Sequence, residues 1–187
     1  ACTGTQRYGF GPQQNAGQCE NRRMRGRSVY YIIIAGIVLL DQIVKAATDC
    51  MLVPGESVPV IENVFHLTYV QNTGAAFSIL QSHRGLLVLL SAILVVLLLV
   101  FFIRRGKGQP ALLNAAMAAI ISGGIGNMID RIVRGYVVDT FDFRVWPVFN
   151  VADISVCVGC ALLLIYVIFF DRKNPESGEK RDDAKSV

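Results

Sequence analysis

The sequence has few charged residues and few histidines. Only 17% of its 187 residues are Asp, Glu, Lys or Arg, whereas about 25% is usual in soluble domains. No stretch interleaves Lys or Arg with exposed aromatic residues, so nucleic-acid binding is not expected. His66 and His83 are isolated, no HExxH motif occurs, and no cysteine spacing resembles a zinc site. The sequence therefore predicts neither a metal nor a cofactor.

Hydrophobic residues are abundant instead, at 53% of the chain with a mean hydropathy of +0.47. Apolar segments at about 28–48, 86–103, 111–129 and 151–170 have the length of membrane-spanning helices. The first follows four arginines, as in a cleaved signal peptide, but no small-residue cleavage site follows it. The sequence predicts an all-α integral membrane protein: a bundle of four transmembrane helices with a small extracytoplasmic β-sheet and loop.

The two ends of the chain differ from this middle part. The first residues are rich in Gly, Gln, Asn and Thr and lack apolar periodicity, and Met24 is a plausible natural start. The alternative is a small ligand-like module closed by Cys2 and Cys19, and their pairing stays open. The predicted division is an appended or disordered N-terminal segment, a membrane-embedded domain and a charged cytoplasmic tail, at residues 1–23, 24–171 and 172–187.

The basic residues are distributed unevenly along the chain. Of the 18 Lys and Arg residues, 12 lie between Arg22 and the first apolar segment, between the second and third segments, or in the tail. The positive-inside rule then predicts that both termini are cytoplasmic. Polar residues at the ends of three helices would consequently meet at the extracytoplasmic side, namely Asn72, Asp130, Asp139 and Asp153.

Two of these residues are carboxylates in apolar surroundings. Asp139 lies in the short connection 135–143, and Asp153 begins the last apolar segment. A carboxylate at the edge of hydrocarbon is costly and is a candidate for function. Two carboxylates held close together share one proton, as in aspartic peptidases. We therefore expect Asp139 and Asp153 to form a catalytic pair.

Other polar residues have positions that suggest support. Asp41 and Lys45 are four residues apart and share a helix face, so they can form an ion pair. Asn72 and Gly74 lie in the polar connection 49–84, which contains β-branched residues typical of a small sheet. In segment 111–129, small residues recur every fourth position, which favours close packing of a central helix. Cys157-Val-Gly-Cys160 resembles a redox pair, but its apolar surroundings favour a packing role.

Five segments in this order resemble the bacterial lipoprotein signal peptidase family, also called signal peptidase II, across about residues 29–170. The segments are 41–45 (Asp-Gln-Ile-Val-Lys), 72–77 (Asn-Thr-Gly-Ala-Ala-Phe), 123–131 (Gly-Gly-Ile-Gly-Asn-Met-Ile-Asp-Arg), 137–139 (Val-Val-Asp) with Phe141, and 149–153 (Phe-Asn-Val-Ala-Asp). The resemblance implies a multi-pass aspartic endopeptidase of the bacterial cytoplasmic (inner) membrane. It would remove the signal peptide of diacylglyceryl prolipoproteins, cutting before the lipidated cysteine.

The resemblance also implies roles for individual residues. Asp139 and Asp153 would be the catalytic pair. Asn150 would cap the last helix or orient Asp153, and Asn72 and Asn127 would hold substrate backbone. An Asp130–Arg131 ion pair would brace the connection bearing Asp139. The remaining support residues are Gly74, Asp41 and Lys45.

Several partners and two rival functions complete these expectations. Membrane lipid, prolipoproteins and globomycin-type inhibitors are the expected partners, and a monomer is expected. A transporter or channel would also use intramembrane carboxylates. However, no paired repeat of broken helices occurs in the sequence. A non-catalytic scaffold would use the small-residue helix alone and leave the polar groups unexplained.

Overall fold

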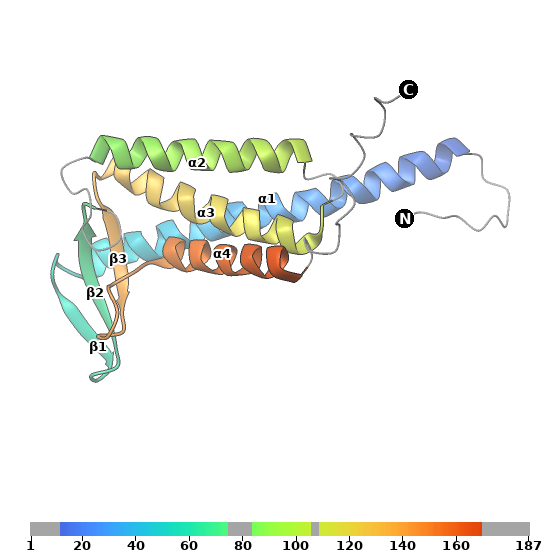
Figure 1. The fold of residues 1–187 in the computed structure, drawn as a ribbon. Helices are drawn as coiled ribbons and strands as arrows, with labels where there is room; N and C mark the ends of the chain where they lie inside the picture. Colours follow the sequence, from blue (N-terminus) through green and yellow to red (C-terminus); the bar gives the residue numbers. More distant parts are fainter. Residues whose placement is uncertain (1–11, 75–83, 106–108, 170–187) are drawn as a thin grey trace, which may run out of the picture.

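The computed structural model describes residues 12–74, 84–105 and 109–169. In this part of the chain, four helices form an elongated bundle, and a three-stranded sheet covers one end of it (Figure 1). The start of α1 and the end of α4 lie at the opposite end. The helices are α1 (Pro12–Met51), α2 (Arg84–Arg105), α3 (Ala111–Val133) and α4 (Val151–Phe169).

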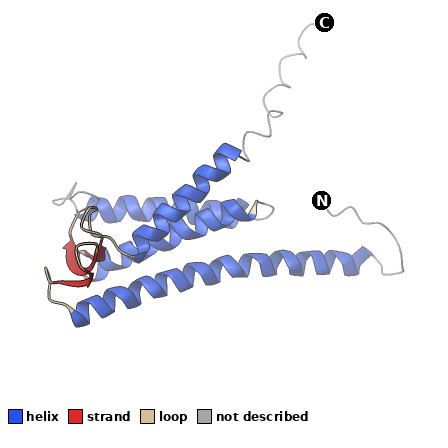
Figure 2. Cartoon of the chain, turned by 90° about the horizontal axis from the view of Figure 1, so that it is seen from below, coloured by secondary structure: helices blue, strands red, loops and turns tan. Residues whose placement is uncertain are grey.

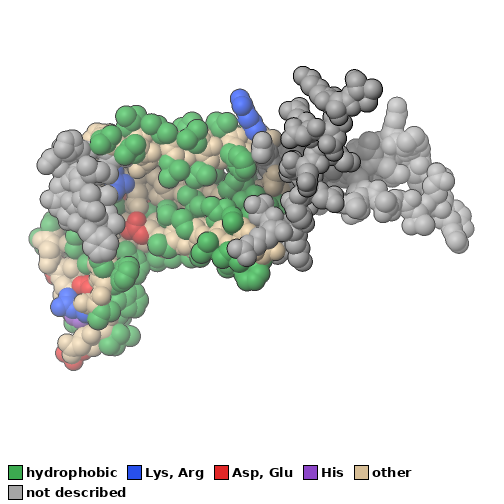
Figure 3. Space-filling model, in the orientation of Figure 1, with side chains coloured by type: hydrophobic (Ala, Val, Ile, Leu, Met, Phe, Trp, Pro, Cys, Tyr) green, Lys and Arg blue, Asp and Glu red, His purple; other side chains and the backbone are tan. Residues whose placement is uncertain are grey.

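The helices have the apolar character that a membrane requires. In the described residues, the segments Ser28–Met51, Ala111–Val133 and Val151–Phe169 are long and apolar enough to span a bilayer. The shorter apolar stretch Val88–Arg104 belongs to α2, which has 22 residues in all. Hydrophobic side chains cover most of the visible bundle surface, and acidic ones lie where the bundle meets the sheet (Figure 3). The prediction of four membrane helices agrees with this helix count.

Helix α3 is the central helix, as its small residues predicted. About 61% of the most hydrophobic stretch of α3 is buried inside the protein, whereas the corresponding shares are 11% in α1 and 17% in α4. A Cβ added to Gly123 would overlap the Ala152 carbonyl of α4, and one on Gly126 would lie 2.6 Å from Asp41 Oδ2 of α1. The absence of a side chain at these two positions therefore lets both neighbouring helices approach α3 closely.

The half of the bundle farther from the sheet is packed by apolar side chains. Phe102 of α2 is fully buried and forms a cluster with Leu113, Met117 and Ile121 of α3. Tyr30 and Tyr31 of α1 contact the Phe102 ring edge to face, a geometry that aromatic pairs favour. Polar residues are concentrated in the other half, which adjoins the sheet.

The sheet corrects the prediction of an all-α fold. It consists of β1 (Ser57–Ile61), β2 (Phe65–Asn72) and β3 (Val137–Asp142), antiparallel in the order β1-β2-β3. The first two strands fall where the sequence predicted a small sheet. The third replaces the connection predicted at 135–143, because its pairing partner β2 lies far away in the sequence. Asp139 consequently belongs to a strand that is paired with β2.

The N-terminal part of α1 extends beyond the bundle (Figure 2). Its helix begins at Pro12, within the segment 1–23 that the sequence predicted to be appended or disordered. The predicted membrane segment 28–48 lies wholly inside α1. Residues 1–11, 75–83, 106–108 and 170–187 lie outside the described part, and so do the side chains of 12–27. The open question about Cys2 and Cys19 and most of the predicted loop therefore fall outside it.

Candidate active site

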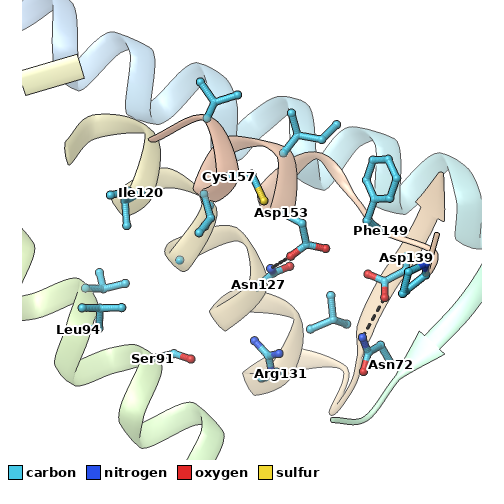
Figure 4. Close-up of a pocket in the computed structure, with 18 of the residues that line it drawn as sticks. Asn72, Ser91, Leu94, Ile120, Asn127, Arg131, Asp139, Phe149, Asp153 and Cys157 are labelled. Atoms are coloured by element: carbon cyan, nitrogen blue, oxygen red, sulfur yellow. Dashed lines mark hydrogen bonds between the residues drawn. The ribbon is translucent and has the colours of Figure 1, made fainter. Parts of the chain in front are cut away.

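A cavity of about 750 Å³ lies between α2, α3, α4 and the sheet. Its apolar wall is formed largely by Leu94, Val95 and Leu98 of α2 and by Val156 and Cys157 of α4. Its polar side, next to the sheet, is formed by Asn72, Asn127, Arg131, Asp139 and Asp153. The carboxyl groups of Asp139 and Asp153 face one another there (Figure 4). The structure thus brings together the two carboxylates that the sequence singled out.

Asp139 is positioned by strand pairing. It is opposite Val70 in the β2–β3 register, so its side chain shares a sheet face with Asn72, its diagonal neighbour. The Asn72 amide donates to Asp139 Oδ2 over 3.0 Å, and the Asn150 amide donates to Oδ1 over 2.6 Å. Both carboxyl oxygens therefore accept a hydrogen bond, although only 2% of the residue is exposed.

Asp153 is positioned by the first turn of α4. Asn150 precedes the helix, and its side-chain carbonyl accepts the Asp153 backbone N–H over 2.9 Å. Asp153 Oδ2 in return accepts the Asn150 backbone N–H over 3.2 Å, which makes a reciprocal capping box. The other oxygen, Oδ1, accepts from the Asn127 amide over 2.8 Å. The predicted cap at Asn150 and its orientation of Asp153 are both present.

Asp139 has strongly perturbed electrostatics. Burial raises the pKa of Asp139 from 3.8 to about 7, and the nearby Asp153 carboxylate also raises it. The hydrogen bonds from Asn72 and Asn150 and the charge of Lys45 act in the opposite direction. A carboxyl group with a pKa of about 7 can hold or release a proton at neutral pH, which suits acid–base chemistry.

A buried ion cluster lies behind the cavity. Lys45 is 2.9 Å from Asp41 Oδ2 and 2.9 Å from Asp130 Oδ2, so the predicted Asp41–Lys45 pair is confirmed. Asp130 also pairs with Arg134 over 3.5 Å and accepts the Val138 backbone N–H over 3.2 Å. The bond to Val138 braces the strand that bears Asp139.

Asp130 has two cationic partners besides the predicted Arg131. It pairs with Lys45 and with Arg134. Arg134 is four residues from Asp130 and therefore shares its helix face. The pair of Asp130 with Arg131 stays a prediction, and Arg131 also donates to the Gly74 carbonyl over 3.3 Å. The Gly74 backbone N–H donates to Asn72 Oδ1 over 3.0 Å, which leaves the Asn72 NH₂ group to face Asp139.

The ten residues predicted from the sequence form one connected hydrogen-bond and ion-pair network. Sequence reasoning missed Gln42, whose amide donates to the Gly126 carbonyl and to Asp130 Oδ1, although Gln42 lies within a segment that resembles the family. It also missed the ion pair of Arg134 with Asp130 and the contribution of Trp146 to the cavity wall. The signal for Trp146 was its aromatic, amphipathic character next to a membrane helix.

Apolar helices that enclose a cavity, with two facing carboxylates at its polar end, are the arrangement of a membrane-embedded aspartic peptidase. The family model described as signal peptidase (SPase) II matches residues 33–169. The chain belongs to this family of aspartic peptidases, as the sequence motifs predicted. Family membership favours an enzyme over the transporter and the non-catalytic scaffold.

Individual relatives match almost over their whole lengths. A lipoprotein signal peptidase of Halothermothrix orenii is 48% identical over 138 residues, which cover 73% of this chain and 93% of that protein. The lipoprotein signal peptidase of Fusobacterium nucleatum is 40% identical, and the matched residues cover 83% of this chain and 95% of that protein. A solved structure described as a bacterial membrane enzyme is also similar, with a TM-score of 0.73 and 28% identity. It covers 82% of this chain and 95% of that one.

Proposed function

We propose that this protein removes the signal peptide from lipoprotein precursors, with Asp139 and Asp153 as its catalytic pair. The observation that supports this most is the meeting of the two carboxyl groups at the polar end of an apolar cavity. They come from a strand and a helix, and each is held by an amide NH₂ group. Such fixed positions are what general acid–base catalysis requires.

The proposed reaction uses one proton shared by the pair. The ionised carboxylate accepts a proton from water, which attacks the scissile carbonyl carbon, while the protonated carboxyl group donates to the carbonyl oxygen. The burial that raises the pKa of Asp139 favours the proton on this residue. Collapse of the tetrahedral intermediate then breaks the C–N bond. The carboxyl group that took the proton from water donates it to the leaving nitrogen, and the other carboxylate recovers its proton from a hydroxyl group of the intermediate.

The shape of the cavity supports a lipid-bearing substrate. Its apolar wall between α2 and α4 would receive acyl chains, while the polar end next to the sheet would hold the peptide. We propose that the substrate bears diacylglycerol on a cysteine and that the bond cut is the one before it. Asn72 and Arg131 line the cavity near the carboxylates and would contact the peptide backbone.

The distribution of charge supports an orientation in the bacterial cytoplasmic membrane. From Arg22 on, 12 of the 18 Lys and Arg residues lie in sequence segments that precede or follow the helix ends opposite the sheet. The positive-inside rule places that end in the cytoplasm. We therefore propose cytoplasmic termini and an extracytoplasmic active site. We also propose that the protein acts as a monomer and that globomycin blocks it by occupying the cavity.

The test is cleavage of a synthetic lipoprotein precursor with a diacylglyceryl cysteine by purified protein in detergent. Wild-type protein should cut it, and Asp153→Asn should lose activity by at least about 10²-fold, because one acid–base partner is missing. The matched control is Asp142→Asn, which alters a buried carboxylate on the other face of β3. Folded Asp153→Asn protein with wild-type activity would contradict the proposal.

A further inference from the structure

Lys45 has a contact that its ion pairs do not require. Its side chain is fully buried, and an ammonium group has three donors and no acceptor. Two of them face Asp41 and Asp130, each over 2.9 Å. The third donates to Asn127 Oδ1 over 3.0 Å. Lys45 thus connects the ion cluster to an amide of the candidate active site.

This contact determines which way the Asn127 amide points. Its carbonyl oxygen accepts from Lys45 and, over 3.2 Å, from the Asn150 amide. Its NH₂ group is therefore directed at Asp153 Oδ1, 2.8 Å away. A reversed amide would place its NH₂ group against two other donors and its carbonyl against a carboxylate. Each of these contacts would be repulsive, and buried groups would lose their partners.

The second amide depends on the first. The Asn150 NH₂ group donates both to Asn127 Oδ1 and to Asp139 Oδ1. The Asn150 carbonyl oxygen is engaged with the Asp153 backbone N–H. The two amides therefore present one NH₂ group to each carboxylate. Lys45 is the charged donor at the start of this chain of hydrogen bonds.

We infer that Lys45 is a positioning residue: it fixes the direction of the Asn127 amide and, through Asn150, supplies an N–H donor to each of the two carboxyl groups. The inference rests on the proposed function of Asp139 and Asp153. It assigns to Lys45 a role in turnover in addition to its ion pairs. Asn127 then has a fixed hydrogen-bond partner on each side.

The charge of Lys45 gives a second measurable effect. Lys45 itself interacts with Asp41 on α1, Asp130 on α3 and Asp139 on β3. The other charged groups of this part of the molecule interact with those residues or with one another, namely Asp49 on α1, Arg131 and Arg134 on α3, and Asp153 on α4. Lys45 lowers the pKa of Asp139 by its positive charge. Removing that charge alone should move the alkaline limb of the pH–rate profile to higher pH.

The experiment compares three variants of the whole chain in detergent, using cleavage of the lipidated precursor. Lys45→Met removes both the charge and the donor. Lys45→Met combined with Asp41→Asn removes one charge of each sign, so folding does not depend on an unpaired buried carboxylate. The matched control is Arg134→Gln, because Arg134 belongs to the same cluster through Asp130 and Asp49. Thermal unfolding is measured for all of them.

The double variant should fold and lose about 10²-fold in kcat, the size of effect that misplaced catalytic groups produce. Its KM should stay within about twofold, since the ground-state contacts remain. Arg134→Gln should lower thermal stability and keep kcat. Lys45→Met and the double variant both lack the charge of Lys45, so the alkaline limb of the pH–rate profile should lie at higher pH than that of the wild type in each of the two that folds.

Two results would overturn the inference: a folded double variant with wild-type kcat, or an equal loss of kcat in Arg134→Gln, which would indicate a general structural effect. Failure of the proposed function is distinguishable from these. It would appear as activity in Asp139→Asn or Asp153→Asn. Inactive aspartate variants together with an active double variant would refute only the role of Lys45.

Discussion

The raised pKa of Asp139 predicts an unusual dependence of stability on pH. The folded protein holds the Asp139 proton up to about pH 7, whereas an unfolded chain releases it near pH 3.8. Between these values the folded state binds more protons, so its stability falls as the pH rises. At about 1.36 kcal/mol per pH unit, the full effect is about 4 kcal/mol, and about 3 kcal/mol of it falls between pH 5 and pH 8.

Asp139→Asn removes this titration. The asparagine cannot accept hydrogen bonds on both sides from Asn72 and Asn150, and one mismatched donor costs about 1–3 kcal/mol at any pH. We therefore expect the variant to be less stable than the wild type at pH 5 and equally stable or more stable at pH 8. Between pH 5 and pH 8, the difference in free energy of unfolding between the variant and the wild type should change by about 3 kcal/mol. Cleavage should be lost at both pH values.

The measurement is the free energy of unfolding of both proteins in detergent at pH 5 and pH 8, with Asp142→Asn as the control. Burial raises the pKa of Asp142, but hydrogen bonds from the Arg144 backbone N–H and the Thr68 hydroxyl outweigh it, so the net pKa is below 3.8. Asp142 is thus ionised throughout this range in both the folded and the unfolded state. The difference in free energy of unfolding between Asp142→Asn and the wild type should therefore be the same at pH 5 and pH 8. If the difference in free energy of unfolding between Asp139→Asn and the wild type were also the same at pH 5 and pH 8, the reasoning would be refuted.

Two further predictions concern packing and capping. Gly159→Ala would place a Cβ 2.6 Å from Ile120 Cγ1 and force α3 and α4 apart, so it should lower stability by about 1–3 kcal/mol. Gly36→Ala, with no atom within 4 Å, should not destabilise the protein; equal thermal unfolding of the two variants would contradict this account. Asn150→Ala should lose about 1 kcal/mol of helix capping together with cleavage activity. Asn150→Ser should restore the cap but not the activity, because a serine cannot also reach Asp139; recovery of both in a cleavage assay would count against the bridging role.

Local patterns in the sequence were sufficient for much of this protein. Apolar length predicted the membrane helices, and a spacing of four residues predicted the Asp41–Lys45 pair. Small residues at every fourth position predicted that α3 is central, and Asn150 ahead of an apolar segment predicted a helix cap. Each of these follows from helix geometry, which relates residues within one or two turns.

Tertiary structure decided the features that depend on register between distant segments. Strand β3 exists only because β2 pairs with it, and this pairing places Asp139 beside Asn72. The direction of the Asn127 amide depends on Lys45, which lies 82 positions away in the chain. Sequence alone singled out most of the polar residues of the site, although not Gln42 or Arg134. Their mutual orientation required the packed helices, because a hydrogen bond depends on where donor and acceptor lie in space.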